Sequence, residues 1–331
     1  MNRNDADLTR RDYLKWMSAA GLAATGLSAQ SQSTWPSKPI RWIMPFAAGG
    51  TSSIVARSIA AEITKQMGAN FVIDNKGGGG GVPAMQELAR APADGYTLIM
   101  SHIGLMAVNP LIYPDAGYDV NKDFVPVTLI NRLPSLFCVH KDVPVTDIKS
   151  LVEYAKSRPG QLNYASAGIA SAGHLAHEAL KLRTGIFITH IPYRGTGPAL
   201  ADVLAGRVEL FSAGTPALLP HIKSGALRCI GVGSPQRISA LPDVPSISET
   251  YPGFETEQWY GIHARAGTPR DIILRMQQEV AKALRAPAVV AKHEAKSAIP
   301  GGGLPEEYGA FVAKEQARWK EVVIKAGIKA G

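Results

Sequence analysis

The stretch that decides the fold is Ile40-Arg-Trp-Ile-Met-Pro-Phe-Ala-Ala-Gly-Gly-Thr-Ser-Ser-Ile-Val-Ala-Arg57. Its first part, Ile40 to Met44, is a short apolar run typical of a buried strand. From Ile54 to Met67 apolar residues recur at helical spacing, and Gly68 ends the pattern. The turn between them, Phe46 to Ser53, contains paired glycines and three hydroxyl residues. A helix that begins after such a turn leaves backbone N–H groups unpaired at its N-terminus, which is the positive end of the helix dipole. The stretch therefore predicts a binding site for a carboxylate or phosphate.

The same strand-then-helix order repeats along the next fifty residues. Phe71 to Asp74 reads as a second strand, Val82 to Arg90 as a helix, and Tyr96 to Ser101 as a third strand. Such alternation predicts a mostly parallel sheet, in which ligands bind at the carboxyl ends of the strands. The loops Asn75 to Gly81 and Ser101 to Gly104 should therefore lie beside the first turn.

A second α/β half follows. We interpret Val125 to Val143 as two strands, one leaving the first half and one entering the second, with breaks at Asn131-Arg132 and Pro134. Helices and strands then alternate to Val232, and a helical tail begins at Thr268. This order predicts an α/β clamshell with a cleft between two lobes, each a mostly parallel sheet flanked by helices. We expect the first lobe at 35–131 and 253–331 and the second at 132–252.

Composition excludes some function classes. The chain has 331 residues, of which 46% are hydrophobic and 19% charged, as in a soluble globular protein with a sizeable core. Its formal charge is +8, but the Lys and Arg residues are scattered among Asp and Glu, and no basic run carries interleaved aromatics. We therefore expect no nucleic-acid partner, although a positive field favours encounter with anionic solutes.

The first 29 residues read as a targeting segment. Thr9-Arg10-Arg11-Asp12-Tyr13-Leu14-Lys15 carries paired arginines, a short apolar run follows to Leu27, and Leu27-Ser28-Ala29 is a candidate cleavage site. The pattern predicts a cleavable twin-arginine export signal and a periplasmic mature protein. In that compartment Cys138 and Cys229 could form a disulfide or remain buried thiols, and the sequence leaves both readings open.

Three catalytic or cofactor motifs are suggested and then disfavoured. The glycine run at 77–81 matches G-x-G-x-x-A through Ala84, but the acidic residue expected at the end of the next strand is missing, so a pocket-lining loop is favoured over a nucleotide site. Gly168-Ile169-Ala170-Ser171-Ala172-Gly173 lacks the spacing of a nucleophile elbow. His174 and His177 are one helical turn apart, but no third metal ligand is indicated. We expect no metal, no cofactor and no enzyme activity.

With these residues placed, the chain from about Trp35 to its end resembles the Bug-type extracytoplasmic solute receptors of tripartite tricarboxylate transporters. The resemblance rests on an ordered set of short signatures, which include Pro45-Phe46-Ala47-Ala48-Gly49-Gly50, Asp94-Gly95-Tyr96-Thr97-Leu98, Asp123-Phe124-Val125-Pro126-Val127, Leu162-Asn163-Tyr164-Ala165-Ser166-Ala167-Gly168, His190-Ile191-Pro192-Tyr193-Arg194-Gly195 and Leu241-Pro242-Asp243-Val244-Pro245. It implies a type II periplasmic-binding-protein clamshell that closes on a small carboxylate and delivers it to membrane permease subunits.

The resemblance also implies which residues bind the ligand. Backbone N–H groups and hydroxyls of the first strand–helix loop and of the Ser/Gly loop in the second lobe should hold the carboxylate, and three further segments should line the cleft. These residues are Phe46, Ala47, Gly49, Gly50, Thr51, Ser53, His102, Ile103, Gly104, Ser166, Ala167, Gly168, Ser171, Tyr193, Gly195, Ala213, Gly214 and Thr215.

Ser53 stands where such receptors often carry an Asp, which argues against an amino-acid ligand. We therefore predict that the ligand is a mono- or dicarboxylate, with aromatic acids among the candidates. We also expect the receptor to be monomeric. A protonated His102 would pair with a second carboxylate. The alternative is an orphan receptor that presents its ligand to a membrane sensor instead of a permease.

Overall fold

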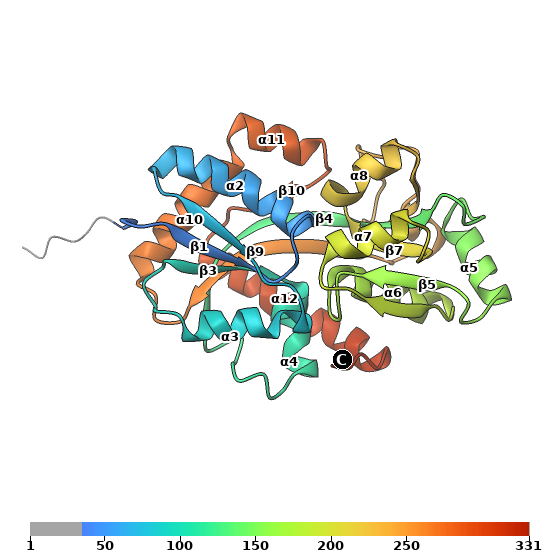
Figure 1. The fold of residues 1–331 in the computed structure, drawn as a ribbon, viewed down its shortest axis with the longest axis horizontal. Helices are drawn as coiled ribbons and strands as arrows, with labels where there is room; N and C mark the ends of the chain where they lie inside the picture. Colours follow the sequence, from blue (N-terminus) through green and yellow to red (C-terminus); the bar gives the residue numbers. More distant parts are fainter. Residues whose placement is uncertain (1–34, 331) are drawn as a thin grey trace, which may run out of the picture. The chain divides into compact units, whose positions relative to one another are not determined.

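A computed structural model describes residues 35–330 of the chain. From Lys38 onward these residues form one compact unit. It contains a single mixed sheet whose strands run in the order β2-β1-β3-β9-β4-β7-β5-β6, with helices on its faces (Figure 1). The predicted export signal lies outside the described residues.

The first lobe begins with the predicted parallel strands. β1 (Ile40–Met44) pairs in parallel with both β2 (Phe71–Asn75) and β3 (Thr97–His102). The connecting helices are α2 (Thr51–Met67) and α3 (Val82–Arg90). All three loops that we expected at one edge of the sheet follow the carboxyl ends of these strands.

Helix α2 differs from its prediction at one end. It begins at Thr51, three residues earlier than the apolar periodicity indicated, and Gly50 is its N-cap. Thr51, Ser52 and Ser53 are thus buried in the first turn of the helix instead of lying in the preceding loop. The apolar pattern could not reveal this turn because hydroxyl residues occupy it.

The interpretation of Val125 to Val143 as two strands was wrong. β4 (Phe124–His140) is one continuous strand that serves both lobes. Up to Pro134 it pairs antiparallel with β9 (Glu257–Arg265), and from Ser135 it pairs with the strands of the second lobe. Pro134, which has no N–H to donate, falls at this change of partner. The β4–β9 register is irregular between Pro126 and Thr128 and between Leu129 and Asn131, but the strand continues through both places.

The second lobe alternates helix and strand as predicted. β5 is parallel to β6 and β7, whereas β7 and β8 pair antiparallel with β4. The elements are α5 (Ile148–Ser157), β5 (Asn163–Ser166), α6 (Ala172–Thr184), β6 (Thr189–Pro192), α7 (Thr196–Leu204), β7 (Leu210–Gly214), α8 (Thr215–Lys223), β8 (Leu227–Val232) and α9 (Ile247–Thr250).

The chain ends on the first lobe. Its last elements are α10 (Arg270–Leu284), α11 (Pro287–Glu294), β10 (Ile299–Pro300) and α12 (Pro305–Lys325), and β10 pairs with β4. Helix α12 packs on β4 and on η2 (Gly104–Val108), a π-helical turn that follows β3 and leads into α4 (Asn109–Ile112). The buried carboxylate of Glu315 on α12 accepts hydrogen bonds from the indole N–H groups of Trp259 (2.9 Å) and Trp319 (3.2 Å).

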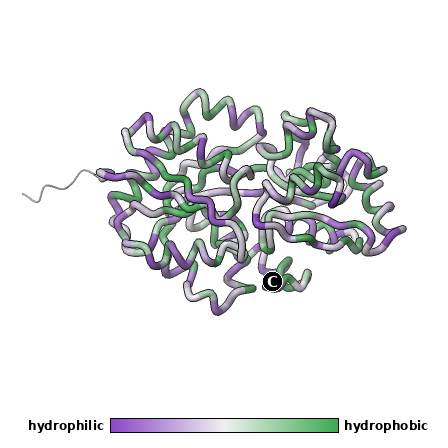
Figure 2. Tube along the Cα trace, viewed as in Figure 1, coloured by the Kyte–Doolittle hydropathy of each residue, from purple (hydrophilic) through white to green (hydrophobic). Residues whose placement is uncertain are grey.

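Apolar residues form buried clusters, one of which reaches from the first lobe to Ala170 and Leu175 of the second. One cluster joins β1, β3 and β9 to α12, and two others cover the faces of the second-lobe strands. Figure 2 shows hydrophobic residues along the central strands and hydrophilic residues at outer turns. The fold is thus the two-lobed α/β clamshell that the sequence predicts. The boundaries proposed for the two lobes stay a prediction.

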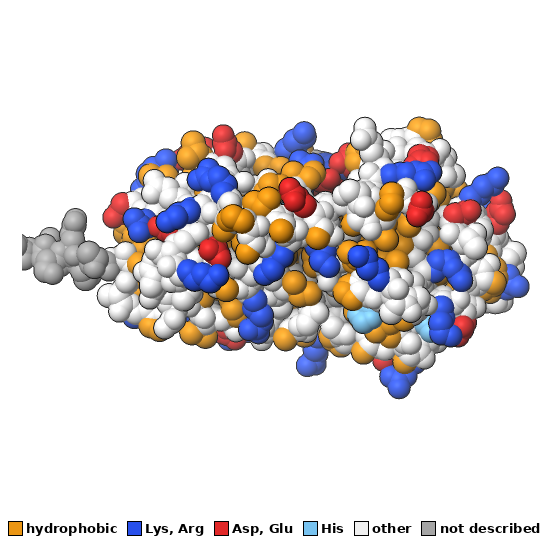
Figure 3. Space-filling model, turned by 90° about the horizontal axis from the view of Figure 1, so that it is seen from above, with side chains coloured by type: hydrophobic (Ala, Val, Ile, Leu, Met, Phe, Trp, Pro, Cys, Tyr) orange, Lys and Arg blue, Asp and Glu red, His pale blue; other side chains and the backbone are white. Residues whose placement is uncertain are grey.

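Cys138 and Cys229 are cross-strand partners on β4 and β8. Both are buried, and within residues 35–330 both are free thiols. Among the same residues no helix is long and apolar enough to cross a bilayer. Cationic and anionic side chains are interspersed over the face that carries α2, α8 and α11 (Figure 3), as the sequence indicates.

Candidate functional site

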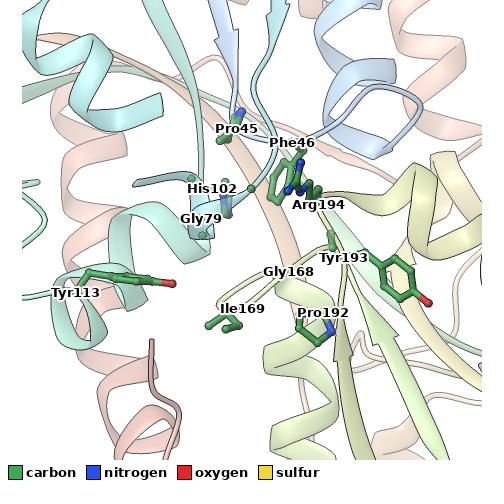
Figure 4. Close-up of a pocket in the computed structure, with 14 residues that line it drawn as sticks. Pro45, Phe46, Gly79, His102, Tyr113, Gly168, Ile169, Pro192, Tyr193 and Arg194 are labelled. Atoms are coloured by element: carbon green, nitrogen blue, oxygen red, sulfur yellow. The ribbon is translucent and has the colours of Figure 1, made fainter. Parts of the chain in front are cut away.

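Two adjoining cavities lie where the loops of the two lobes meet. The larger has a volume of about 240 Å³, and we call it the large chamber (Figure 4). It is lined by Pro45, Phe46, Gly78, Gly79, Gly80, Gly81, His102, Tyr113, Ala167, Gly168, Ile169, Pro192, Tyr193 and Arg194. The smaller, of about 20 Å³, is the small chamber. It is lined by Phe46, His102, Ile103, Ala167, Ser171, Ala172, Gly173, Thr196, Ser212, Gln258, Trp259 and Tyr260.

The loop after β1 reaches the second lobe through its backbone. The N–H of Ala47 donates to the carbonyl oxygen of Arg194 at 3.0 Å. Gly77 lies against the same junction, and a Cβ placed on it would be 2.3 Å from that carbonyl oxygen. Gly195, at φ +152°, approaches Ala47 as closely, with 2.8 Å between its added Cβ and the Ala47 nitrogen. Only glycine fits at these two positions while the lobes are together.

His102 lies between the two chambers and is neutral. Its ring lies 4.6 Å from that of Phe46, and its Nδ1 accepts a hydrogen bond from the N–H of Gly104 at 3.0 Å. This bond leaves Nε2 as the donor of a neutral imidazole. Burial lowers the pKa of His102 to about 3. Burial thus opposes the protonated form that pairing of His102 with a second carboxylate requires, and that pairing stays a prediction, although the residue does line both chambers.

In the second lobe, the Ser/Gly loop leads into the N-terminus of α6. The hydroxyl of Ser166 is bonded to His190 Nε2 (2.6 Å) and to the backbone of Gly168, so it holds the loop in shape. Ser171 is the N-cap of α6. Ala172 and Gly173 follow in its first turn, where amide groups have no acceptor within the helix, and both line the small chamber.

Ser212, on β7, adds an unpaired hydroxyl to the small chamber. Its side chain is buried, with 2% exposed, and its Oγ has no hydrogen-bond partner among the described residues. A buried hydroxyl normally has a partner, because leaving it unpaired costs about 1–3 kcal/mol. The first-turn amides of α6 and the Ser212 hydroxyl thus offer donors to an anion in this chamber.

The structure brings seven of the predicted residues to the walls of the two chambers. These are Phe46, His102, Ile103, Ala167, Gly168, Ser171 and Tyr193. Tyr193 lines the large chamber, but its hydroxyl points away from it (Figure 4) and donates to Asp202 Oδ2 at 2.7 Å.

The other predicted residues lie next to the chambers but do not line them. Ala47, Gly49, Gly50 and Gly195 make contacts between the two loops. Gly104 packs against Ala170. A last group lies inside the protein. The Ser53 hydroxyl accepts from Asn75 Nδ2, the Thr215 hydroxyl donates to the carbonyl of Lys296, and Ser166 is bonded as described. Thr51, Ala213 and Gly214 are buried, and Gly214 packs against Thr51.

Sequence reasoning missed several lining residues. Gln258, Trp259 and Tyr260 come from β9, Tyr113 from the end of α4, and Ser212 from the middle of a buried strand. No motif marks them, because their place depends on how distant strands pair. Gly78 to Gly81 could have been included, since the glycine run was already interpreted as a pocket loop.

His174 and His177, the disfavoured metal pair, belong to a stacked aromatic cluster beside the small chamber. His174 lies 4.0 Å from His190, and His177 lies 4.4 Å from Tyr164, measured between ring centroids. Burial lowers the pKa of His174 to about 3 and that of His177 to about 4. Over residues 35–330 no group of three His, Cys, Asp or Glu side chains is arranged to hold a metal ion.

The fold and this interlobe site define a solute-binding protein, and comparison with known proteins agrees. Residues 55–328 match the family described as Tripartite tricarboxylate transporter family receptor. Protein BugT of Bordetella pertussis is 35% identical over 311 residues, which cover 93% of this chain and 95% of BugT. The chain therefore belongs to the receptor family of tripartite tricarboxylate transporters, whose members are periplasmic solute receptors and not enzymes.

Two solved structures give the same assignment. Rpa4515 of R. palustris, determined with adipate, superposes with a TM-score of 0.86 at 40% identity, covering 89% of this chain and 99% of that one. MatC of Rhodopseudomonas palustris, with bound malate, superposes with a TM-score of 0.82 at 31% identity, covering 87% and 100%.

Proposed function

We propose that this protein is an extracytoplasmic receptor that binds a small carboxylate between its lobes and delivers it to a tripartite tricarboxylate permease. The observation that carries the proposal is the small chamber, where the first-turn amides of α6 meet the hydroxyl of Ser212, which has no hydrogen-bond partner within residues 35–330. These donors suit a carboxylate and require no cation or cofactor. The adipate and malate bound by the two relatives belong to the same chemical class.

In this proposal the protein holds its ligand mainly through backbone N–H groups and hydroxyls of the two loops. The predicted residues that line the chambers make the contacts, and those in the loop-to-loop junction close the cleft. Residues 9–15 would direct export through the twin-arginine route, and the mature receptor would act as a monomer.

A binding experiment tests the ligand class. Mature protein from Gln30 is titrated calorimetrically with mono- and dicarboxylates, amino acids and nucleotides, and thermal unfolding is followed in parallel. A ligand that binds only the folded state adds about 2.7 kcal/mol at a hundredfold excess over Kd. Binding of a carboxylate and of no nucleotide supports the proposal, and binding of no carboxylate by folded protein overturns it.

Two serine variants locate the carboxylate. Ser212→Ala should weaken carboxylate binding about tenfold through loss of a buried charge-assisted hydrogen bond. Ser224→Ala is the control, because Ser224 is exposed at the end of α8 and lines neither chamber. Unchanged affinity in Ser212→Ala would remove the small chamber from the proposal.

Delivery to a permease is tested in the organism. Deletion of the gene should abolish uptake of the acid that binds in vitro. Normal uptake combined with a lost transcriptional response to the acid would favour the sensor role instead.

A further inference from the structure

The two chambers differ so much in size that they cannot hold equal parts of a ligand. About 10–15 Å³ of such volume is needed for one water molecule, so the small chamber, at about 20 Å³, takes roughly one small polar group. The large chamber offers about 240 Å³ and shares Phe46, His102 and Ala167 with it. A carboxylate bound in the small chamber would therefore place the rest of its molecule in the large one.

In the described part of the chain, the walls of the large chamber carry one cationic side chain and no anionic one. The cation is Arg194, and no Asp or Glu is among the lining residues. Arg194 makes no side-chain ion pair or hydrogen bond within residues 35–330, although its backbone is fixed at the lobe junction by the bond from Ala47. Its side chain runs beside the glycine loop, with Cγ and Cδ 3.9 Å from a Cβ placed on Gly78. Because His102 is neutral, Arg194 supplies the positive charge of this chamber.

The opposite wall adds a second donor. Tyr113 enters the chamber with its hydroxyl directed toward the centre (Figure 4), and that hydroxyl has no hydrogen-bond partner in the described part of the chain. A guanidinium and a phenol that face one cavity from two sides suit a group with several acceptor oxygens.

We propose that the large chamber is a second anion subsite, in which Arg194 and Tyr113 receive the distal carboxylate of an extended dicarboxylate. The inference rests on the proposed function, because it requires the first carboxylate to lie in the small chamber. It makes Arg194 the residue that separates dicarboxylates from monocarboxylates of equal length. The competing interpretation is an ordinary exposed arginine, whose charge is screened and contributes little.

The test compares acids that differ by one carboxylate. Calorimetric titrations use the pairs succinate and butyrate, glutarate and pentanoate, and adipate and hexanoate. The proteins are wild type, Arg194→Gln, Arg194→Lys, Tyr113→Phe and the control Arg57→Gln. Arg57 is exposed on α2 and lines neither chamber, so its variant loses the same charge without touching the site.

Wild type should prefer the dicarboxylate in at least one pair. In Arg194→Gln the affinity for that dicarboxylate should fall about tenfold, whereas the affinity for the monocarboxylate of the same length should stay within about twofold of the wild-type value. Arg194→Lys should retain part of the preference for the dicarboxylate. Tyr113→Phe should lose less of this preference than Arg194→Gln does, and Arg57→Gln should have the wild-type preference. Melting temperatures confirm that each variant folds.

Three results would overturn the subsite. They are equal affinity of wild type for both members of every pair, an equal loss for both members in Arg194→Gln, and a loss of the same size in Arg57→Gln. Each leaves carboxylate binding itself intact. If folded wild type binds none of the six acids and no other carboxylate, the proposed function fails as well.

Discussion

The backbone N–H of Ala47 and the carbonyl oxygen of Arg194 are joined by a 3.0 Å hydrogen bond. Ala47 follows β1 in the first lobe, and Arg194 follows β6 in the second. The bond thus spans the cleft mouth without using a side chain. Because the two loops are in direct backbone contact here, a side chain enlarged by even one methyl group at this junction would push them apart.

Gly77→Ala should impair closure of the cleft. The new methyl group would lie 2.3 Å from the Arg194 carbonyl oxygen and 2.5 Å from the Ala47 nitrogen, so the loops must move apart. We expect carboxylate affinity to fall about tenfold or more, with a melting temperature near that of wild type, because Gly77 belongs to none of the buried apolar clusters described above. Calorimetry and thermal unfolding measure the two effects.

The matched control for this variant is Gly309→Ala in α12. Its added Cβ meets only Pro126 Cγ, at an ordinary 3.5 Å, and alanine is favoured over glycine in a helix by about 0.5–1 kcal/mol. Affinity should remain unchanged there. Equal affinity in both variants would mean that ligand binding does not require the Ala47–Arg194 junction.

Local patterns in the sequence predicted most of the individual elements. β1, α3 and β8 were placed by apolar periodicity and by Gly or Pro at their ends, and the structure confirms them. The start of α2 and the continuity of β4 were not predicted. Partner exchange along β4 depends on residues more than a hundred positions away in β9. From the local sequence Pro134 predicts the end of a strand, whereas in the structure the strand continues and Pro134 lies where its partner changes.

The candidate site could be predicted only where a loop follows a strand. Phe46, His102 and Gly168 lie on such loops and line the chambers. Thr51 was placed in a loop because hydroxyl residues hide the helix start, and Ser212 was overlooked because a buried strand residue has no pattern of its own. Tyr193 was predicted, but no sequence pattern indicates that Asp202 accepts the hydrogen bond of its hydroxyl.

Tyr193→Phe should leave carboxylate binding within about twofold of wild type. The hydroxyl donates to Asp202, which also pairs with Arg207 at 2.7 Å. Neither Asp202 nor Arg207 lines the large chamber. Burial and that bond raise the pKa of Tyr193 to about 12, so it stays protonated at neutral pH. Calorimetry on the variant checks the prediction. A tenfold loss would show that the phenol turns toward the ligand.

Glu315→Ala should destabilise the protein by about 3–5 kcal/mol, because it removes a buried acceptor and leaves two buried indole N–H groups unpaired. The groups are those of Trp259 and Trp319. Urea unfolding followed by tryptophan fluorescence measures the loss. Glu315→Gln, which keeps an acceptor oxygen, should lose less. Similar stability in the two variants would contradict the importance of these bonds.

The stability of the protein should fall as the solution becomes acidic. Burial lowers the pKa of His177 to about 4, whereas an unfolded histidine titrates near 6.5. Between about pH 6.5 and about pH 4 the unfolded chain therefore binds more protons than the folded one, and the free energy of unfolding decreases as the pH falls. His102, His174 and His263, with pKa values lowered to about 3, act in the same direction.

His177→Phe should make this dependence shallower by up to about 1.4 kcal/mol per pH unit. Phenylalanine keeps a ring between Phe137 and Tyr164 but does not titrate. Urea unfolding of both proteins across the acidic range gives the two slopes. Parallel curves would show that His177 takes up its proton equally in the folded and unfolded states.

The continuous strand β4 also bears on how the protein folds and evolves. Its first half completes the sheet of one lobe and its second half that of the other, so neither lobe has all its strands if the chain is cut within it. Excision of a single lobe would leave an open sheet edge, which invites aggregation. Chain synthesis likewise cannot finish the first lobe until β9 emerges, which happens only after the second lobe has been made. We therefore expect the two lobes to fold together and not as independent domains.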